Sequence, residues 1–303
     1  MSSVPSSSAP SASISAAAIP VLPFAELAPR YDVILCDVWG VLHNGANAFA
    51  AASDALIRAR AAGGTVILVS NAPRPNADVG VILDRFGVPR TAYDAIVTSG
   101  DVTTGLLRAR GAGKVWHLGP ERDLGIYQGA GVGLVEMEAS ELVVCTGLFD
   151  DTTETPETYR DTLAAMKARD LTMICANPDI VVERGGELIW CAGALAEAYQ
   201  AIGGEAIWCG KPHRPIYEAA FAKAAELRGA PAEPNRFLAI GDALRTDLAG
   251  ALGVGIDCLF IAGGIHAGEL GLERSGTIDP KALARLIEDG PGRPVAAAPQ
   301  LVW

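Results

Sequence analysis

Four short apolar runs of the sequence are each followed by side chains that could do chemistry. Two runs lead into carboxylates, one into a hydroxyl and an amide, and one into a lysine. A carboxylate can attack a phosphorus atom if the repulsion between the two anions is removed, and Mg²⁺ together with a lysine would remove it. This pattern indicates phosphoryl transfer through an aspartyl-phosphate, and the residues are Asp37, Ser70, Asn71, Lys211, Asp242 and Asp247.

Each residue type suits one part of that chemistry. Asp37 and Asp242, with a backbone carbonyl, could hold Mg²⁺, a hard cation that binds a few carboxylates plus substrate phosphate. Lys211 and the Ser70 hydroxyl, with backbone N–H groups of the Trp39-Gly40 and Asn71 turns, would bind the phosphoryl oxygens on which charge develops.

These side chains need a fold that brings them together. The apolar runs alternate with longer Ala-rich amphipathic stretches, which predicts βαβ units and a parallel sheet covered on both faces. Working residues of such sheets lie just beyond the carboxyl ends of the strands. The predicted strands are 33–36, 65–69, 115–118, 142–145, 171–175, 206–209, 237–240 and 259–261, and the predicted helices are 50–62, 78–86, 157–169, 193–202, 215–227 and 246–252.

In order and spacing, these residues resemble the four motifs of the haloacid dehalogenase (HAD)-like hydrolases. The subtype resembled is class IIA, the group of NagD and the 4-nitrophenylphosphatases, which carries a large α/β cap between the second and third motifs. Thr98-Ser99-Gly100, Asn177-Pro178-Asp179 and Gly210-Lys211-Pro212-His213 support that subtype. The four motifs are Asp37-x-Trp39-Gly40-Val41-Leu42, Ser70-Asn71, Lys211-Pro212 and Gly241-Asp242-x-x-x-Thr246-Asp247.

The resemblance implies a role for each matched residue. Asp37 would be the nucleophile, Ser70 and Lys211 would bind phosphate, and Asp242 would bind Mg²⁺. Asp247 would order the metal's shell, and the backbone carbonyl of Trp39 would be a third protein ligand. The residues expected on the substrate side are Gly40, Asn71, Asn177, Asp179 and His213.

Trp39 departs from the family pattern. The family's phosphatases carry a second aspartate two residues after the nucleophile, which protonates the leaving oxygen, and a general acid contributes about 10²- to 10⁴-fold. Several alternatives stay open: a substrate with a good leaving group, His43 or Asp101 as the acid, or a hydrolase without turnover that binds a phosphorylated ligand. Dehalogenase or phosphonatase-like chemistry is a further alternative. We interpret the Trp39 ring as a packing residue in preference to a surface on which substrate stacks.

The predicted fold class is α/β, a doubly wound parallel-sheet (Rossmann-like) core with an inserted α/β cap domain. The core is expected to comprise residues 24–75 together with 207–290, and the cap residues 76–206. Residues 1–23, rich in Ser, Ala and Pro, are predicted to be a disordered tail. Residues 291–303 are predicted to be a second tail, docked by Leu301 and Trp303.

Composition excludes several function classes. The chain has 24 Lys+Arg against 35 Asp+Glu, a net charge of −11, which weighs against nucleic acid and anionic membranes as partners. No apolar stretch approaches the ~18 residues of a membrane span. The six cysteines lie far apart and are predicted to be buried free thiols of a reducing compartment. We therefore expect a cytoplasmic enzyme for a small phosphorylated molecule, and the resemblance is compatible with a homodimer through the cap.

Overall fold

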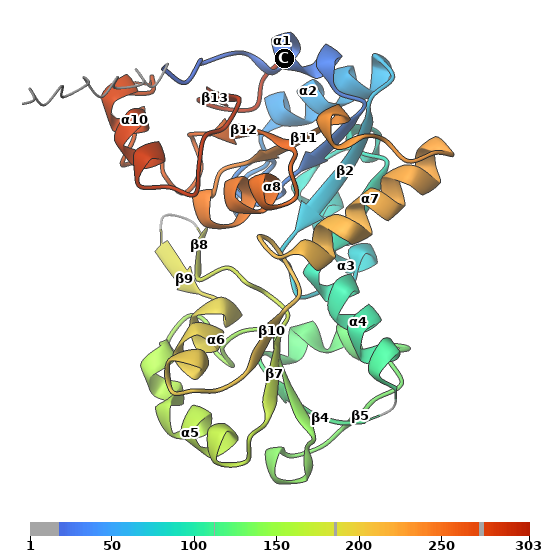
Figure 1. Ribbon diagram of the computed structural model, residues 1–303, viewed down its shortest axis with the longest axis vertical. Coiled ribbons are helices and arrows are strands. Elements are labelled where there is room, and N and C mark those ends of the chain that lie inside the picture. Colours follow the sequence, from blue (N-terminus) through green and yellow to red (C-terminus); the bar gives the residue numbers. More distant parts are fainter. Residues whose placement is uncertain (1–17, 112, 185–186, 273–275) are drawn as a thin grey trace, which may run out of the picture.

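The computed structural model describes residues 18–111, 113–184, 187–272 and 276–303. Two parallel sheets dominate it, one in each lobe of the molecule (Figure 1). The core sheet has the order β13-β12-β11-β1-β2-β3, and its strands are β1 (Val33–Cys36), β2 (Thr65–Ser70), β3 (Ala95–Thr98), β11 (Phe237–Gly241), β12 (Asp257–Ile261) and β13 (Ala296–Ala298).

The cap has its own sheet and a separate hairpin. Its five strands follow the order β10-β7-β6-β4-β5, and all neighbours are parallel. The cap strands are β4 (Lys114–Leu118), β5 (Gly133–Leu134), β6 (Leu142–Cys145), β7 (Thr172–Cys175) and β10 (Ala206–Trp208). Strands β8 (Val181–Arg184) and β9 (Glu187–Trp190) form the antiparallel hairpin, which lies between the two lobes in Figure 1.

Helices cover both faces of the core sheet, which is why its strands are apolar throughout. Along β1, Ile34 and Cys36 pack with the buried side chains of α2 and α3, whereas Val33 and Leu35 pack with those of α7, α8 and α10. The helices are α1 (Phe24–Leu27), α2 (Ala50–Ala61), α3 (Asn76–Phe86), α4 (Ser99–Arg110), α5 (Arg160–Ala168), α6 (Ala192–Ala201), α7 (Arg214–Arg228), α8 (Ala249–Gly253) and α10 (Pro280–Glu288). The predicted α/β core with an inserted α/β cap is thus confirmed.

The predicted domain boundaries need correction at both crossings. Strand β3 pairs with β2, so residues 76–98, predicted to open the cap, belong to the core sheet. Strand β10 pairs with β7, so Ala206–Trp208 belong to the cap. The predicted crossing comes too early because the predicted elements include neither β3 nor the helix after it, α4.

The predicted C-terminal tail is also corrected, because Ala296–Ala298 form strand β13 at the edge of the core sheet. Three alanines lack the β-branched side chains that mark a strand, but small side chains fit a fully buried position. Leu301 is buried, and the ring of Trp303 meets that of Phe24 edge-on.

The described part of the predicted N-terminal tail is ordered as well. The Ala297 N–H donates to the Pro20 carbonyl at 2.9 Å, and the Leu22 N–H donates to the Ala297 carbonyl at 3.0 Å. Residues 1–17 of that predicted tail lie outside the described residues. All six cysteines are buried, as predicted. Across the described ranges, none of the helices is both long and apolar enough to cross a membrane.

Candidate active site

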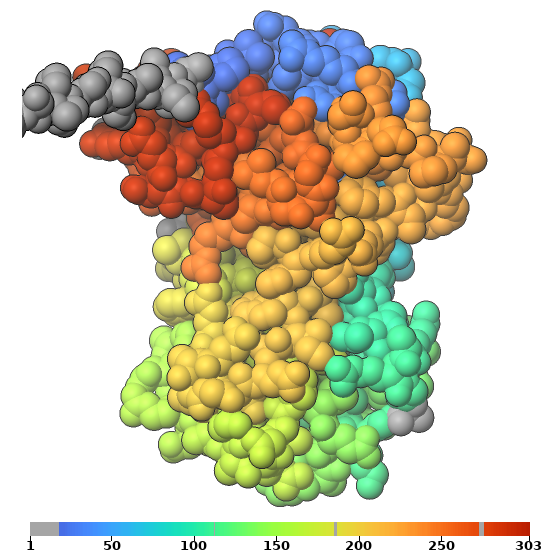
Figure 2. Space-filling view, in the orientation of Figure 1, coloured from blue at the N-terminus to red at the C-terminus, as the bar shows by residue number. Residues whose placement is uncertain are grey.

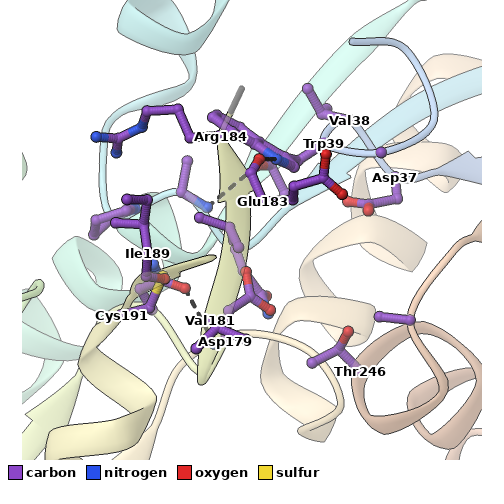
Figure 3. Close-up of a pocket in the computed structure, with 18 of the residues that line it drawn as sticks. Asp37, Val38, Trp39, Asp179, Val181, Glu183, Arg184, Ile189, Cys191 and Thr246 are labelled. Carbon is purple, nitrogen blue, oxygen red and sulfur yellow. Dashed lines mark hydrogen bonds between the residues drawn. The ribbon is translucent and has the colours of Figure 1, made fainter. Parts of the chain in front are cut away.

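The carboxyl ends of the core strands and the loops of the cap enclose one cavity of about 270 Å³. It lies where the molecule narrows between its two lobes (Figure 2). Figure 3 shows Asp37, Trp39 and Thr246 on the core side of this cavity and Asp179, Glu183 and Arg184 on the cap side. The predicted site residues from β1, β2 and β11 therefore share one edge of the sheet, as the parallel topology requires.

Three buried carboxylates meet at that edge. One oxygen from each of Asp37, Asp242 and Asp247 lies within 4.8 Å of the others. Lys211 is buried among them, and its Nζ donates to Asp37 Oδ1 at 2.5 Å and to Asp247 Oδ1 at 2.7 Å. The second Asp247 oxygen accepts the Ala243 N–H at 3.1 Å, so both oxygens of this carboxylate have partners within the protein.

The electrostatics follow from this crowding. Burial and the neighbouring Asp247 raise the pKa of Asp37 well above its usual value, while Lys211 opposes the shift. Burial, with a smaller contribution from Asp247, raises the pKa of Asp242 to about 7. Burial lowers the pKa of Lys211, but the charges of Asp247 and Asp37 outweigh it and leave that pKa well above its usual value. A cation at this cluster would favour the charged form of the carboxylates.

The backbone around Asp242 packs so closely that it leaves no room for a side chain at two glycines. A Cβ at Gly40 would lie 2.1 Å from Asp242 Oδ2, and one at Gly264 would lie 1.8 Å from it. Asp242 Oδ2 accepts the Ile265 N–H at 2.8 Å, which fixes the carboxylate. Three carboxylates are the hard oxygen ligands that Mg²⁺ binds, so the donor set fits this ion.

Asn71 holds the lysine loop in place and touches the cap. The Lys211 N–H donates to Asn71 Oδ1 at 2.7 Å, and Asn71 Nδ2 donates to the Lys211 carbonyl at 3.1 Å. The same Nδ2 donates to Asp179 Oδ1 of the cap at 2.8 Å. Ser70 lines the cavity, and its Oγ accepts the Ala72 N–H at 3.2 Å.

The side chain of Trp39 reaches across to the cap. Its Nε1 donates to the backbone carbonyl of Glu183, on β8, at 2.7 Å. The ring also meets His43 edge-on and fills the space above Gly45, where a Cβ would lie 2.6 Å from Cζ2. The interpretation of Trp39 as a packing residue was incomplete, since the indole joins core to cap by a hydrogen bond.

Not every predicted residue has the expected surroundings. Asn177, Asp179 and Gly40 line the cavity, but the Gly40 N–H donates to the His43 carbonyl at 2.8 Å and is not available to a phosphoryl oxygen. The ring of His213 stacks on Trp208, and His213 lies outside the lining of the cavity.

The two residues predicted as alternative general acids also differ in their surroundings. Asp101 closes the capping box of α4 with Thr98 and also accepts the Asn76 N–H, so it is not placed to act as an acid. His43 does line the cavity, and its Nδ1 accepts the Gly45 N–H at 3.1 Å. Burial lowers the pKa of His43 to about 4, so the imidazole is neutral near pH 7 and carries its proton on Nε2.

Several charged residues of the cavity wall are not among those predicted from the sequence. Arg74, from the core, pairs with the buried Asp123 of the cap at 2.6 Å. Arg122 and Arg184 both pair with Asp151. Asp123 lies in the 3₁₀ helix Glu121–Tyr127 that follows β4, and Asp151 lies in a turn that follows β6. The carboxyl-end rule applied to the cap sheet therefore indicates that region. The residues are Arg74, Arg122, Asp151 and Arg184, together with Asp123.

Comparison with known proteins agrees with this geometry. The family model described as "Haloacid dehalogenase-like hydrolase" matches residues 34–133, and one described as "HAD-hydrolase-like" matches residues 208–288. A crystal structure of a haloacid dehalogenase-like hydrolase from Brucella suis is 48% identical, with a TM-score of 0.83 over 94% of this chain and 100% of that one. The chain belongs to the haloacid dehalogenase-like hydrolase family.

More distantly similar solved structures share the fold. A p-nitrophenyl phosphatase from Archaeoglobus fulgidus is 19% identical, with a TM-score of 0.69 over 90% of this chain and 97% of its own. A glycerol phosphate phosphatase from Mycobacterium tuberculosis, solved with magnesium, is 23% identical, with a TM-score of 0.62 over 85% of this chain and 77% of its own. Among curated proteins, none matches the sequence.

Proposed function

We propose that this HAD hydrolase is a Mg²⁺-dependent phosphatase that acts on a small phosphorylated metabolite through an aspartyl-phosphate. The observation that carries the proposal is the buried Lys211 ammonium, which lies between Asp37 and Asp247 in a cluster of three carboxylates. Fold similarity to two phosphatases, one of them solved with magnesium, supports it.

Asp37 and Asp242, with the Trp39 carbonyl, would hold Mg²⁺, and Asp247 would order them. The ion supplies positive charge that allows an anionic carboxylate to approach an anionic phosphoryl group. Asp37 forms the new O–P bond while the bond to the leaving oxygen breaks and that oxygen takes the electron pair. Lys211 and Ser70 bind the phosphoryl oxygens. Water then attacks phosphorus, and the Asp37–phosphorus bond breaks with its electron pair going to the Asp37 oxygen. This step returns the Asp37 carboxylate and releases inorganic phosphate, and the proton of the water passes to solvent.

The leaving oxygen can be accommodated in two ways. His43, held neutral by burial, offers an Nε2–H hydrogen bond to that oxygen, and it becomes a proton donor only at a pH low enough to protonate its ring. Alternatively, the substrate has a leaving group that needs no proton. Trp39 takes no part in proton transfer, because an indole N–H is neither acid nor base in this range.

The test is phosphate release from a panel of phosphomonoesters, acyl phosphates and phosphonates, with Mg²⁺ or EDTA. Asp37→Asn should abolish release, whereas Asp54→Asn, at an exposed ion pair on α2, should retain it. Substantial release by a folded Asp37→Asn variant would refute the nucleophile.

A second candidate, a phosphorylated-ligand binding protein, is favoured by Trp39, which occupies the usual acid position and is hydrogen-bonded to the cap. It predicts Mg²⁺-dependent stabilisation by phosphorylated ligands without phosphate release. The homodimer through the cap and the cytoplasmic location remain predictions.

A further inference from the structure

Two arginines share one carboxylate in the cap wall of the cavity. Arg122 Nη2 donates to Asp151 Oδ2 at 2.5 Å. Arg184 donates to both oxygens of the same carboxylate, through Nη1 at 3.3 Å and Nη2 at 3.0 Å. We call Arg122 and Arg184 the arginine pair. Both members and Asp151 line the same cavity as Asp37.

The shared carboxylate is fixed before any ligand arrives. The Asp151 side chain is only 10% exposed. The adjacent Asp150 ties down its loop by accepting the N–H and hydroxyl of Thr152 and the hydroxyl of Thr153. The arginine pair therefore has a defined anchor, so binding to it would cost little side-chain ordering.

The arginine pair has more donors than its carboxylate accepts. Two guanidinium groups donate to the one carboxylate of Asp151, while Asp150 and Asp123 interact with Arg122 only through charge. The side chains of Arg122 and Arg184 are 46% and 41% exposed, so each keeps donors directed to solvent. An exposed ion pair between one cation and one anion contributes little to stability. A guanidinium with unused N–H donors in a cavity wall, however, can donate two parallel hydrogen bonds to a carboxylate or a phosphate.

The surroundings separate this place from the carboxylate cluster. In Figure 3 the Arg184 side chain extends from β8 away from Asp37. The wall in that region carries apolar side chains from the hairpin, among them Val181 and Ile189. A cavity of about 270 Å³ thus has Lys211 with the carboxylate cluster at one end, an apolar wall, and the arginine pair with Asp151 at the cap.

We propose that the arginine pair binds a second anionic group of the substrate, a carboxylate or a second phosphate, while the first phosphate lies at Asp37. This inference rests on the proposed phosphatase function and narrows it to small phosphate esters with two anionic ends. Asp151 is the positioning residue that holds both guanidinium groups.

The experiment compares three-carbon phosphomonoesters that differ only at the far end: hydroxymethyl, carboxylate or a second phosphate. Wild-type kcat/KM should be at least tenfold higher for one of the anionic esters. Arg122→Gln and Arg184→Gln should each lower kcat/KM for that ester at least tenfold, mainly through KM, and lower it much less for the hydroxymethyl ester. Arg58→Gln, which removes an exposed arginine of an ion pair on α2, is the matched control.

Equal losses for charged and neutral esters, or a wild-type preference for the neutral ester, would overturn the proposal. Two variants from different elements guard against local misfolding, and thermal melts check both. If no ester is hydrolysed, the phosphatase function fails by itself. Calorimetric titration with the carboxylate and bisphosphate esters then tests the arginine pair separately. Tighter binding of one of these esters than of the neutral ester, with the difference lost in both variants, supports the proposal. Equal binding of charged and neutral esters refutes it.

Discussion

The hydrogen bond from Trp39 to the cap can be tested by Trp39→Phe, which keeps an aromatic ring and removes the indole N–H. Loss of a neutral hydrogen bond costs about 0.5–1.5 kcal/mol, and more if the acceptor stays buried. Trp39 is half-buried and donates at 2.7 Å to the Glu183 carbonyl, so we expect a cost of about 1–2 kcal/mol. That cost corresponds to a roughly 5- to 30-fold larger open population of the hairpin.

Amide hydrogen exchange measures this opening. A two-stranded hairpin is marginal on its own in water, so the ladder of β8 and β9 depends on its contact with the core. In Trp39→Phe, the amides of Val181–Arg184 and Glu187–Trp190 should exchange about 5- to 30-fold faster, with the core strands unchanged. Trp208→Phe, in β10, is the control, because the Trp208 ring stacks on His213. Equal exchange in wild type and Trp39→Phe would refute the reasoning.

Two further predictions concern the carboxylate cluster. Removing one partner of a buried ion pair costs about 3–5 kcal/mol, so Lys211→Met should clearly lower the melting temperature in EDTA. Mg²⁺ should restore part of the lost melting temperature. A loss that Mg²⁺ does not change would contradict the interpretation of the cluster as a cation site. Burial raises the pKa of Asp242 to about 7 from an ordinary 3.8, so the metal-free folded chain holds a proton that the unfolded chain releases between those values. Asp242 therefore makes the metal-free chain less stable as pH rises from 3.8 to about 7. Because Mg²⁺ competes with the proton for this carboxylate, the stabilisation by Mg²⁺ should grow up to about pH 7 and then level off. Thermal melts at a series of pH values with and without Mg²⁺ check this, and a Mg²⁺ effect that is independent of pH would contradict it.

The core part of the site could be predicted because it follows from topology. Asp37 and Asp242 come directly after β1 and β11, which pair side by side, so one rule about parallel strands places both. Lys211 was predicted by the same rule, but the strand before it, β10, belongs to the cap sheet, and the loop after β10 carries the lysine to Asp37.

The cap side could be predicted only in part. Asn177 and Asp179 follow a cap strand, and the resemblance identified them. Arg184 lies on a hairpin whose strands show no regular alternation of buried and exposed residues, so periodicity gave no signal. The partner of Trp39 is a backbone carbonyl, and every residue has one, so no sequence pattern could indicate that contact.

The core sheet is built from two chain segments that are separated by the cap, and this affects folding during synthesis. Strand β1 is covered on one side by β2 and on the other by β11, which follows the whole cap in the chain. The cap strands are contiguous and pair only with one another, so the cap can finish folding while the core still lacks half its sheet. Until Phe237 leaves the ribosome, β1 presents an open edge and an apolar face, a state that favours pairing with other chains. The inserted cap thus prolongs the stage of synthesis at which the chain is most prone to aggregate.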